Sequence, residues 1–91
     1  MISPRQIRAA RALIGLGQRE LAQRAAIGVA TIRRIEAAVD EITGTAKTMS
    51  RIQRALEAGG IIFIDQDSEG GPGVRLRNPS SGRARLPPHR S

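Results

Sequence analysis

The spacing of apolar residues between Gln18 and Ile35 constrains this chain more than any other feature of its sequence. The spacing indicates two short helices, one before and one after residues 26–28. Two helices of about two turns cannot each bury an apolar face alone, so they are expected to cross at a steep angle. Counted from Gln18 as the first position, apolar residues fall at four, five, eight, ten, fifteen and eighteen, namely Leu21, Ala22, Ala25, Ile27, Ile32 and Ile35.

A helix that precedes this unit has a well-defined start. Ser3 can cap it, Pro4 suits its first position, and Gln6 stands three residues after Ser3, which completes a capping box. The helix is expected to end at the glycines of residues 15–17.

A fourth helix is expected over residues 46–58, with Thr45 as its cap. Its apolar residues Met49, Ile52 and Leu56 recur at helical spacing and are expected to face inward. Two glycines at positions 59 and 60 end it.

Two β-rich segments follow the helices. Residues 61–64 are apolar on both faces, residues 74–77 alternate, and residues 65–73 have turn composition, which predicts a hairpin with a nine-residue loop. One face is expected to pack on the helices. The apolar character of the other face favours a contact with a second subunit, and packing within the chain is the alternative. The residues predicted at the dimer interface are Ile61, Ile62, Phe63, Ile64, Val74 and Leu76.

The charge of the chain is unevenly distributed. The formal net charge is +7. Residues 1–58 hold ten basic and five acidic residues. Residues 59–77 hold two basic and three acidic residues, and residues 78–91 hold three basic residues and no acidic one. The excess of basic over acidic residues indicates a polyanionic partner. We expect a helical domain over residues 1–60, a hairpin over residues 61–77 and a disordered basic tail over residues 78–91.

Several classes of protein are excluded. The chain has no cysteine, so it has no disulfide framework and no thiolate zinc site. Its longest apolar run, residues 61–64, is far shorter than the roughly 20 residues of a membrane helix. The N-terminus lacks a signal-peptide core, which predicts a cytoplasmic protein.

The sequence also offers no catalytic or metal site. No nucleophile–base pair can be assembled, and Asp65, Asp67 and Glu69 only mimic the start of a calcium loop. We therefore expect no enzyme activity, cofactor or metal.

The residues of the two-helix unit resemble a known family, the Cro and phage-repressor (XRE) helix-turn-helix regulators. The resemblance covers roughly residues 5–58 and implies a four-helix, lambda-repressor-like domain. Further similarity after residue 58 is to small single-domain bacterial members. The matching positions are Arg11, Gln18, Leu21, Ala22, Ala25, Ile27, Thr31, Ile32, Ile35 and Glu36.

Three positions depart from the family pattern. Ala26 stands where the family has glycine at the tight turn, and a left-handed alanine costs about 1 kcal/mol. Gly17 and Gly28 stand where the family has Ser or Thr caps. Glycine is an acceptable cap, so the fold is expected to survive.

The resemblance also implies which residues touch DNA. Val29, Ala30, Arg33 and Arg34 match the family's base-facing positions, where arginine grips guanine and small apolar groups contact thymine methyls. Contacts with the DNA backbone are expected from Gln18, Arg19, Gly28 and Thr31. Glu36 is expected to be structural and to pair with Arg11.

These observations and the resemblance predict that residues 1–60 are the helix-turn-helix DNA-binding domain of a sequence-specific regulator of transcription. The regulator is expected to bind double-stranded DNA as a homodimer and to read the major groove with the helix over residues 29–37. Whether it is a repressor or an activator stays open. The alternative is an antitoxin that binds a toxin protein through its C-terminal tail and autoregulates its operon. An RNA-binding module ranks last, because Phe63 is the only aromatic residue available for stacking on bases.

Overall fold

The computed structural model describes residues 1–39 and 44–79. The elements are α1 (Pro4–Ile14), α2 (Gln18–Ala25), α3 (Val29–Ala37), α4 (Ala46–Ala58), β1 (Ile61–Ile64) and β2 (Gly73–Leu76). They confirm the prediction of a mostly α chain followed by an antiparallel hairpin. The tail predicted to be disordered, with its expected partner contact, falls largely on residues 80–91, which lie outside the described residues.

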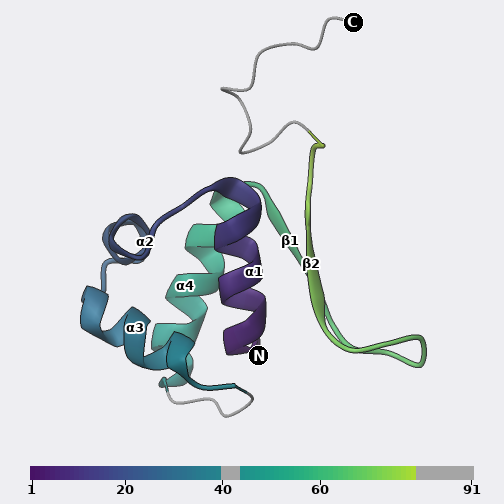
Figure 1. Ribbon diagram of the computed structural model, residues 1–91, viewed down its shortest axis with the longest axis horizontal. Helices are drawn as coiled ribbons and strands as arrows, with labels where there is room; N and C mark the ends of the chain where they lie inside the picture. Colours follow the sequence, from purple (N-terminus) through teal and green to yellow (C-terminus); the bar gives the residue numbers. More distant parts are fainter. Residues whose placement is uncertain (40–43, 80–91) are drawn as a thin grey trace, which may run out of the picture.

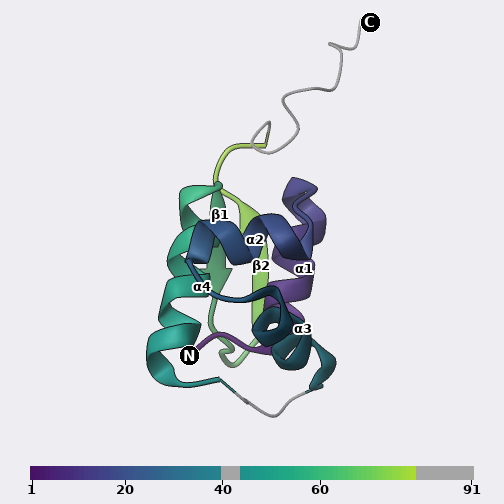
Figure 2. The same cartoon turned by 90° about the vertical axis from the view of Figure 1, so that its left-hand side faces the viewer.

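The elements form three layers. Helices α2 and α3 lie on one side, the hairpin lies on the opposite side, and α1 and α4 run between them (Figure 1). Figure 2 shows the α2–α3 side facing the viewer, with α1 and α4 behind it. The side predicted to bind DNA and the hairpin predicted to bind a second subunit are therefore well separated.

Helix α1 begins as its sequence predicts. The Ser3 hydroxyl accepts a hydrogen bond from the Gln6 backbone N–H at 3.2 Å, and the Gln6 side-chain oxygen accepts one from Ser3 N–H at 2.8 Å. Pro4 occupies the first turn, and Gly15 ends the helix in the left-handed region at φ 66°. Helix α4 is likewise capped by Thr45, whose hydroxyl accepts from Thr48 N–H at 3.1 Å.

The core lies where α2, α3, α1 and α4 meet. Five of the six apolar positions in the predicted two-helix unit are buried, and Ile27 is partly buried against them. The three predicted apolar residues of α4 are also buried. The core residues of α2, α3 and α4 are Leu21, Ala22, Ala25, Ile32, Ile35, Met49, Ile52 and Leu56.

The turn between α2 and α3 contains the one non-glycine residue with positive φ among the described residues. Ala26 adopts φ 59° and ψ 46°, as expected for the position where the family has glycine. Its N–H donates to the Gln23 carbonyl at 3.2 Å, and the Ile27 N–H donates to the Ala22 carbonyl at 3.0 Å. These bonds end α2 and redirect the chain into α3.

Replacing Ala26 with glycine is expected to raise the free energy of unfolding by about 0.5–1 kcal/mol. The reason is that relief of left-handed strain exceeds the entropy that glycine adds to the unfolded chain. Ala9→Gly, at an exposed position within α1, is the matched control and should lower the free energy of unfolding by about 1 kcal/mol. Urea denaturation followed by circular dichroism measures both. Destabilisation by Ala26→Gly would contradict the assignment of strain.

The hairpin differs from its prediction by one residue. β2 spans Gly73–Leu76 rather than residues 74–77, so the loop is residues 65–72. The register pairs Ile64 with Gly73 and Ile61 with Leu76. The sequence of the hairpin places Gly73 in the loop because glycine is typical of turns, yet Gly73 pairs with Ile64 at the first position of β2. The loop is narrowed further by an isolated bridge between Asp67 and Gly70.

The two faces of the hairpin have different environments. Ile61, Phe63, Val74 and Leu76 pack against the helices, and Ile61 has no exposed surface. Because side chains alternate along a strand, the outer face carries the other predicted interface residues, Ile62 and Ile64, and also Arg75. Prediction from the sequence grouped six residues into one interface without separating these faces. Only the outer pair points away from the helices, and Ile64 is 38% exposed.

Gln6 fastens the hairpin to α1. Besides its role in the capping box, its side-chain amide donates to the carbonyls of Ile64 at 3.2 Å and Gly73 at 2.9 Å. Gln6 itself is 5% exposed. The sequence marks Gln6 only as a capping residue, because its hairpin partners are 58 and 67 positions away.

Candidate nucleic-acid interface

The outer surface of α3 presents the residues predicted to touch bases. Ala30, Arg33 and Arg34 are exposed, whereas Ile32, Ile35 and Glu36 are buried on the opposite side of the helix. Val29, also predicted to touch bases, is half-buried and packs against the core. The exposed side of α3 therefore combines a small apolar side chain with two guanidinium groups.

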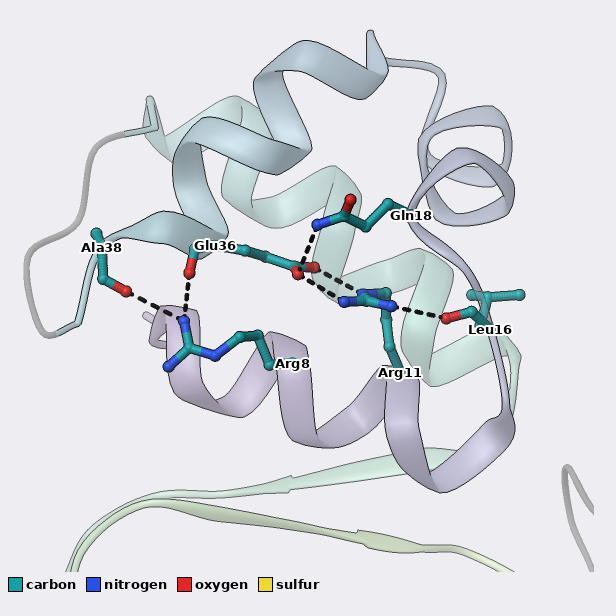
Figure 3. Close-up of polar contacts among 6 residues, drawn as sticks. All are labelled: Arg8, Arg11, Leu16, Gln18, Glu36 and Ala38. Carbon is teal, nitrogen blue, oxygen red and sulfur yellow. Dashed lines mark hydrogen bonds and ion pairs between the residues drawn. The ribbon is translucent and has the colours of Figure 1, made fainter.

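A buried ion pair holds α3 against α1 (Figure 3). Arg11 Nε donates to Glu36 Oε2 and Arg11 Nη2 donates to Glu36 Oε1, each at 2.7 Å. The third nitrogen, Nη1, donates to the Leu16 carbonyl at 3.0 Å. The side chains are 20% and 4% exposed, respectively. This geometry confirms the predicted pairing of Arg11 with Glu36.

The paired carboxylate shifts the pKa of the Arg11 guanidinium upward from its ordinary value. The hydrogen bonds with Glu36 raise the pKa of Arg11, burial opposes that effect, and Coulombic attraction to the same carboxylate adds to it. Bidentate geometry between a guanidinium and a carboxylate also restricts rotation of both side chains. The pair therefore fixes the orientation of α3 relative to α1.

Gln18 joins this ion pair from the start of α2. Its side-chain amide donates to Glu36 Oε1 at 3.1 Å, so it points toward the ion pair (Figure 3). Gln18 was predicted to contact a DNA phosphate, and this hydrogen bond was not foreseen. It ties the first residue of α2 to α3, so the predicted backbone-contacting end of α2 and the predicted base-contacting helix are linked through Glu36.

Arg8 supports the other end of α3. Its Nη1 donates to the Glu36 carbonyl and to the Ala38 carbonyl, the latter at 3.1 Å. A guanidinium at a helix C-terminus satisfies carbonyls that lack partners within the helix and interacts favourably with the helix dipole. The sequence places Arg8 three residues before Arg11, hence on a similar side of α1. That spacing is the signal that could have identified it.

The remaining predicted contact residues lie at the helix starts. Gly17 and Gly28 cap α2 and α3 without a side-chain hydrogen bond, as expected from their lack of a hydroxyl. Arg19 is exposed, Thr31 is half-buried, and the Gly17 N–H donates to Glu20 Oε1 at 3.0 Å. Glu20 thus occupies one backbone donor at the start of α2. The N–H groups of the first turn of α2 have no partner within the helix and can donate hydrogen bonds to an anion.

Arg51 reaches the same side of the molecule from α4. Its Nη1 lies 3.5 Å from the Ala26 carbonyl, at the turn between α2 and α3. Arg24, near the end of α2, is exposed as well. Exposed guanidinium groups therefore come from α2, α3 and α4 on this side.

The acidic loop of the hairpin has a structural explanation. Asp67 Oδ1 accepts hydrogen bonds from the N–H groups of Glu69 at 2.8 Å and Gly70 at 3.2 Å. Within residues 1–39 and 44–79, no group of three or more His, Cys, Asp or Glu residues is arranged to hold a metal ion. In that same part of the chain, no helix has the length and apolar character needed to span a membrane.

Similarity to known proteins does not identify the role of these residues. No protein-family model matches the chain, and no match is found among curated protein sequences.

Proposed function

We propose that this chain is a sequence-specific regulator of transcription that binds double-stranded DNA as a homodimer, with α2 and α3 as its helix-turn-helix. The observation that carries the proposal is the orientation of α3. Arg33 and Arg34 lie on its exposed side, while Arg11, Arg8 and Gln18 hold its other side and its C-terminus. A recognition helix needs both properties, since bidentate contacts with base edges require a rigidly placed helix.

In this docking, the N-terminal part of α3 enters the major groove. Arg33 and Arg34 donate to guanine O6 and N7, and the Ala30 methyl contacts a thymine methyl. Val29 is half-buried, so it offers only part of its side chain to a base. The absence of a side chain on Gly28 lets the start of α3 approach the DNA closely.

Contacts with the DNA backbone come from both helix starts. The first turn of α2, with Gln18 and Arg19, supplies N–H groups and a positive charge to one phosphate. Gly28 and Thr31 lie at the start of α3, where the helix meets the groove. Arg51, beside the turn that joins the two helices, adds a cation to this side. We assign these residues to positioning, because phosphate contacts carry no sequence information.

A randomised pool of DNA duplexes tests the proposal. Several rounds of selection on the purified chain are expected to enrich a motif of two similar half-sites about 10 base pairs apart, because two recognition helices in a dimer bind one helical turn apart. The affinity of the selected duplex should fall steeply as salt rises, because phosphate contacts release counterions. A pool that remains random after selection would refute sequence-specific binding.

A further inference from the structure

The hairpin carries opposite charges at its two ends. Its loop end holds Asp65, Asp67 and Glu69, all exposed, and its open end holds Arg75 and Arg77, also exposed. Arg77 pairs with Gly60 through a backbone hydrogen bond, and Asp67 lies seven residues further along the chain from Gly60. An extended strand of that length spans roughly 20 Å, which exceeds the Debye length of about 8 Å at physiological ionic strength. The two ends therefore act as separate charges.

Neighbouring charged groups within the chain leave this polarity in place. Arg5, in the first turn of α1, borders the hollow that Asp65 also lines, but three carboxylates stand at this end. At the open end, Arg77 Nη2 donates to the Glu57 carbonyl at 3.2 Å, and the two arginines outnumber the single Glu57 carboxylate, which accepts a hydrogen bond from Gln53 at 3.1 Å. The loop end remains acidic and the open end remains basic.

The outer face of the hairpin carries Arg75 opposite Ile62, and its apolar part is the pair of isoleucines on β1. Ile62 and Ile64 point away from α1 and α4, and Ile64 is 38% exposed. This face lies on the side of the molecule opposite α2 and α3 (Figure 1). The acidic loop end is unfavourable for DNA. An apolar strip with one acid end and one basic end is instead complementary to a copy of itself, turned end to end.

We infer that the outer face of the hairpin binds the same face of a second copy, with the two hairpins antiparallel across a twofold axis. In this arrangement, the acidic loop end of each hairpin lies against the basic open end of the other, and the isoleucines of both copies meet between them. A parallel arrangement would place arginines against arginines and carboxylates against carboxylates. The inference deepens the proposed homodimer by naming its surface and polarity.

Paired charge reversals test this inference without DNA. One variant carries Arg75→Glu and Arg77→Glu, and the other carries Asp65→Arg and Glu69→Arg. Asp67 is retained because its carboxylate holds the loop through the Glu69 and Gly70 N–H groups. Each variant alone places like charges together in the antiparallel dimer, so its dissociation constant should rise by at least about tenfold. An equimolar mixture restores opposite charges at both ends and should form a heterodimer.

Sedimentation velocity gives the masses, and native mass spectrometry separates heterodimer from homodimer. The expected result is a dimeric wild-type chain, two variants shifted to monomer, and a mixture that recovers the dimer at low salt and loses it toward 1 M salt, where the Debye length is about 3 Å. Thermal melts of both variants check that they fold. A monomeric wild-type chain, variants that stay dimeric, or a folded mixture that stays monomeric would each overturn the inference. Because DNA is absent, such a failure is distinct from a failure to bind DNA.

Discussion

Replacing Arg11 with methionine is expected to lower the free energy of unfolding by about 3–5 kcal/mol, which leaves a large fraction of the protein unfolded at 25 °C. The substitution removes the two guanidinium hydrogen bonds that Arg11 donates to the Glu36 carboxylate. The Glu36 side chain is 4% exposed, so its charge would be left buried. An unpaired buried charge of this kind costs about 3–5 kcal/mol, and a core of this size supplies only about 3–5 kcal/mol in total. Urea denaturation monitored by circular dichroism measures the change in the free energy of unfolding.

The double variant Arg11→Met with Glu36→Leu is the control. It removes the unpaired charge together with its partner, and such replacements of a buried pair are neutral or stabilising. The double variant is therefore expected to refold to near wild-type stability, while its α3 loses the bidentate restraint from α1. A loss below about 1 kcal/mol for Arg11→Met alone would show that the pair is too solvated to hold α3.

Replacing Arg33 and Arg34 together with alanine is expected to weaken binding to the selected duplex by about a hundredfold or more. Each bidentate contact with guanine contributes about 1–3 kcal/mol of discrimination, and a contribution of about 1.4 kcal/mol is tenfold per arginine. Both side chains are exposed, so the double variant should keep the wild-type free energy of unfolding. Fluorescence anisotropy with the selected duplex and with a scrambled duplex of the same composition gives both affinities.

The variant Arg54→Ala is the control, because it removes a positive charge that lies outside α3. Arg54 is exposed on α4. If it contacts DNA, the contact is to phosphate, so its loss should lower the affinities for selected and scrambled duplexes by the same factor. The affinity for the selected duplex divided by the affinity for the scrambled duplex should fall only when Arg33 and Arg34 are replaced. An unchanged ratio in that variant would move base recognition away from α3.

Local chemistry explains why so much of the fold could be predicted. The capping box of Ser3 and Gln6, the Thr45 cap and the left-handed Ala26 each depend on residues within a few positions of one another. The packing of α2 against α3 is also local, because their buried apolar residues lie within one short segment. The pairing of Arg11 with Glu36 was predicted across 25 positions through the family resemblance and the charges of the two side chains.

The features that could not be predicted depend on distant contacts. Gln6 meets the carbonyls of Ile64 and Gly73 only after the hairpin has folded back over α1. Likewise, the spacing of Arg8 from Arg11 indicates its side of α1, but its contact with the carbonyls at the end of α3 depends on residues about 30 positions away. Alternation in the hairpin defines two faces, but which face meets the helices is decided by packing. For the same reason, the positions of the acidic and basic residues along the outer face are known only from the register of the two strands.

Substitution of single atoms in the selected duplex tests most directly whether α3 reads the major groove. Replacing the guanines of both half-sites with 7-deazaguanine removes the N7 acceptor in the major groove, and replacing them with inosine removes the amino group in the minor groove. The 7-deazaguanine duplex is expected to bind at least about tenfold more weakly than the unmodified duplex, with little change for inosine. Equal binding of the 7-deazaguanine duplex together with a large loss for inosine would place recognition in the minor groove and contradict the proposed role of Arg33 and Arg34.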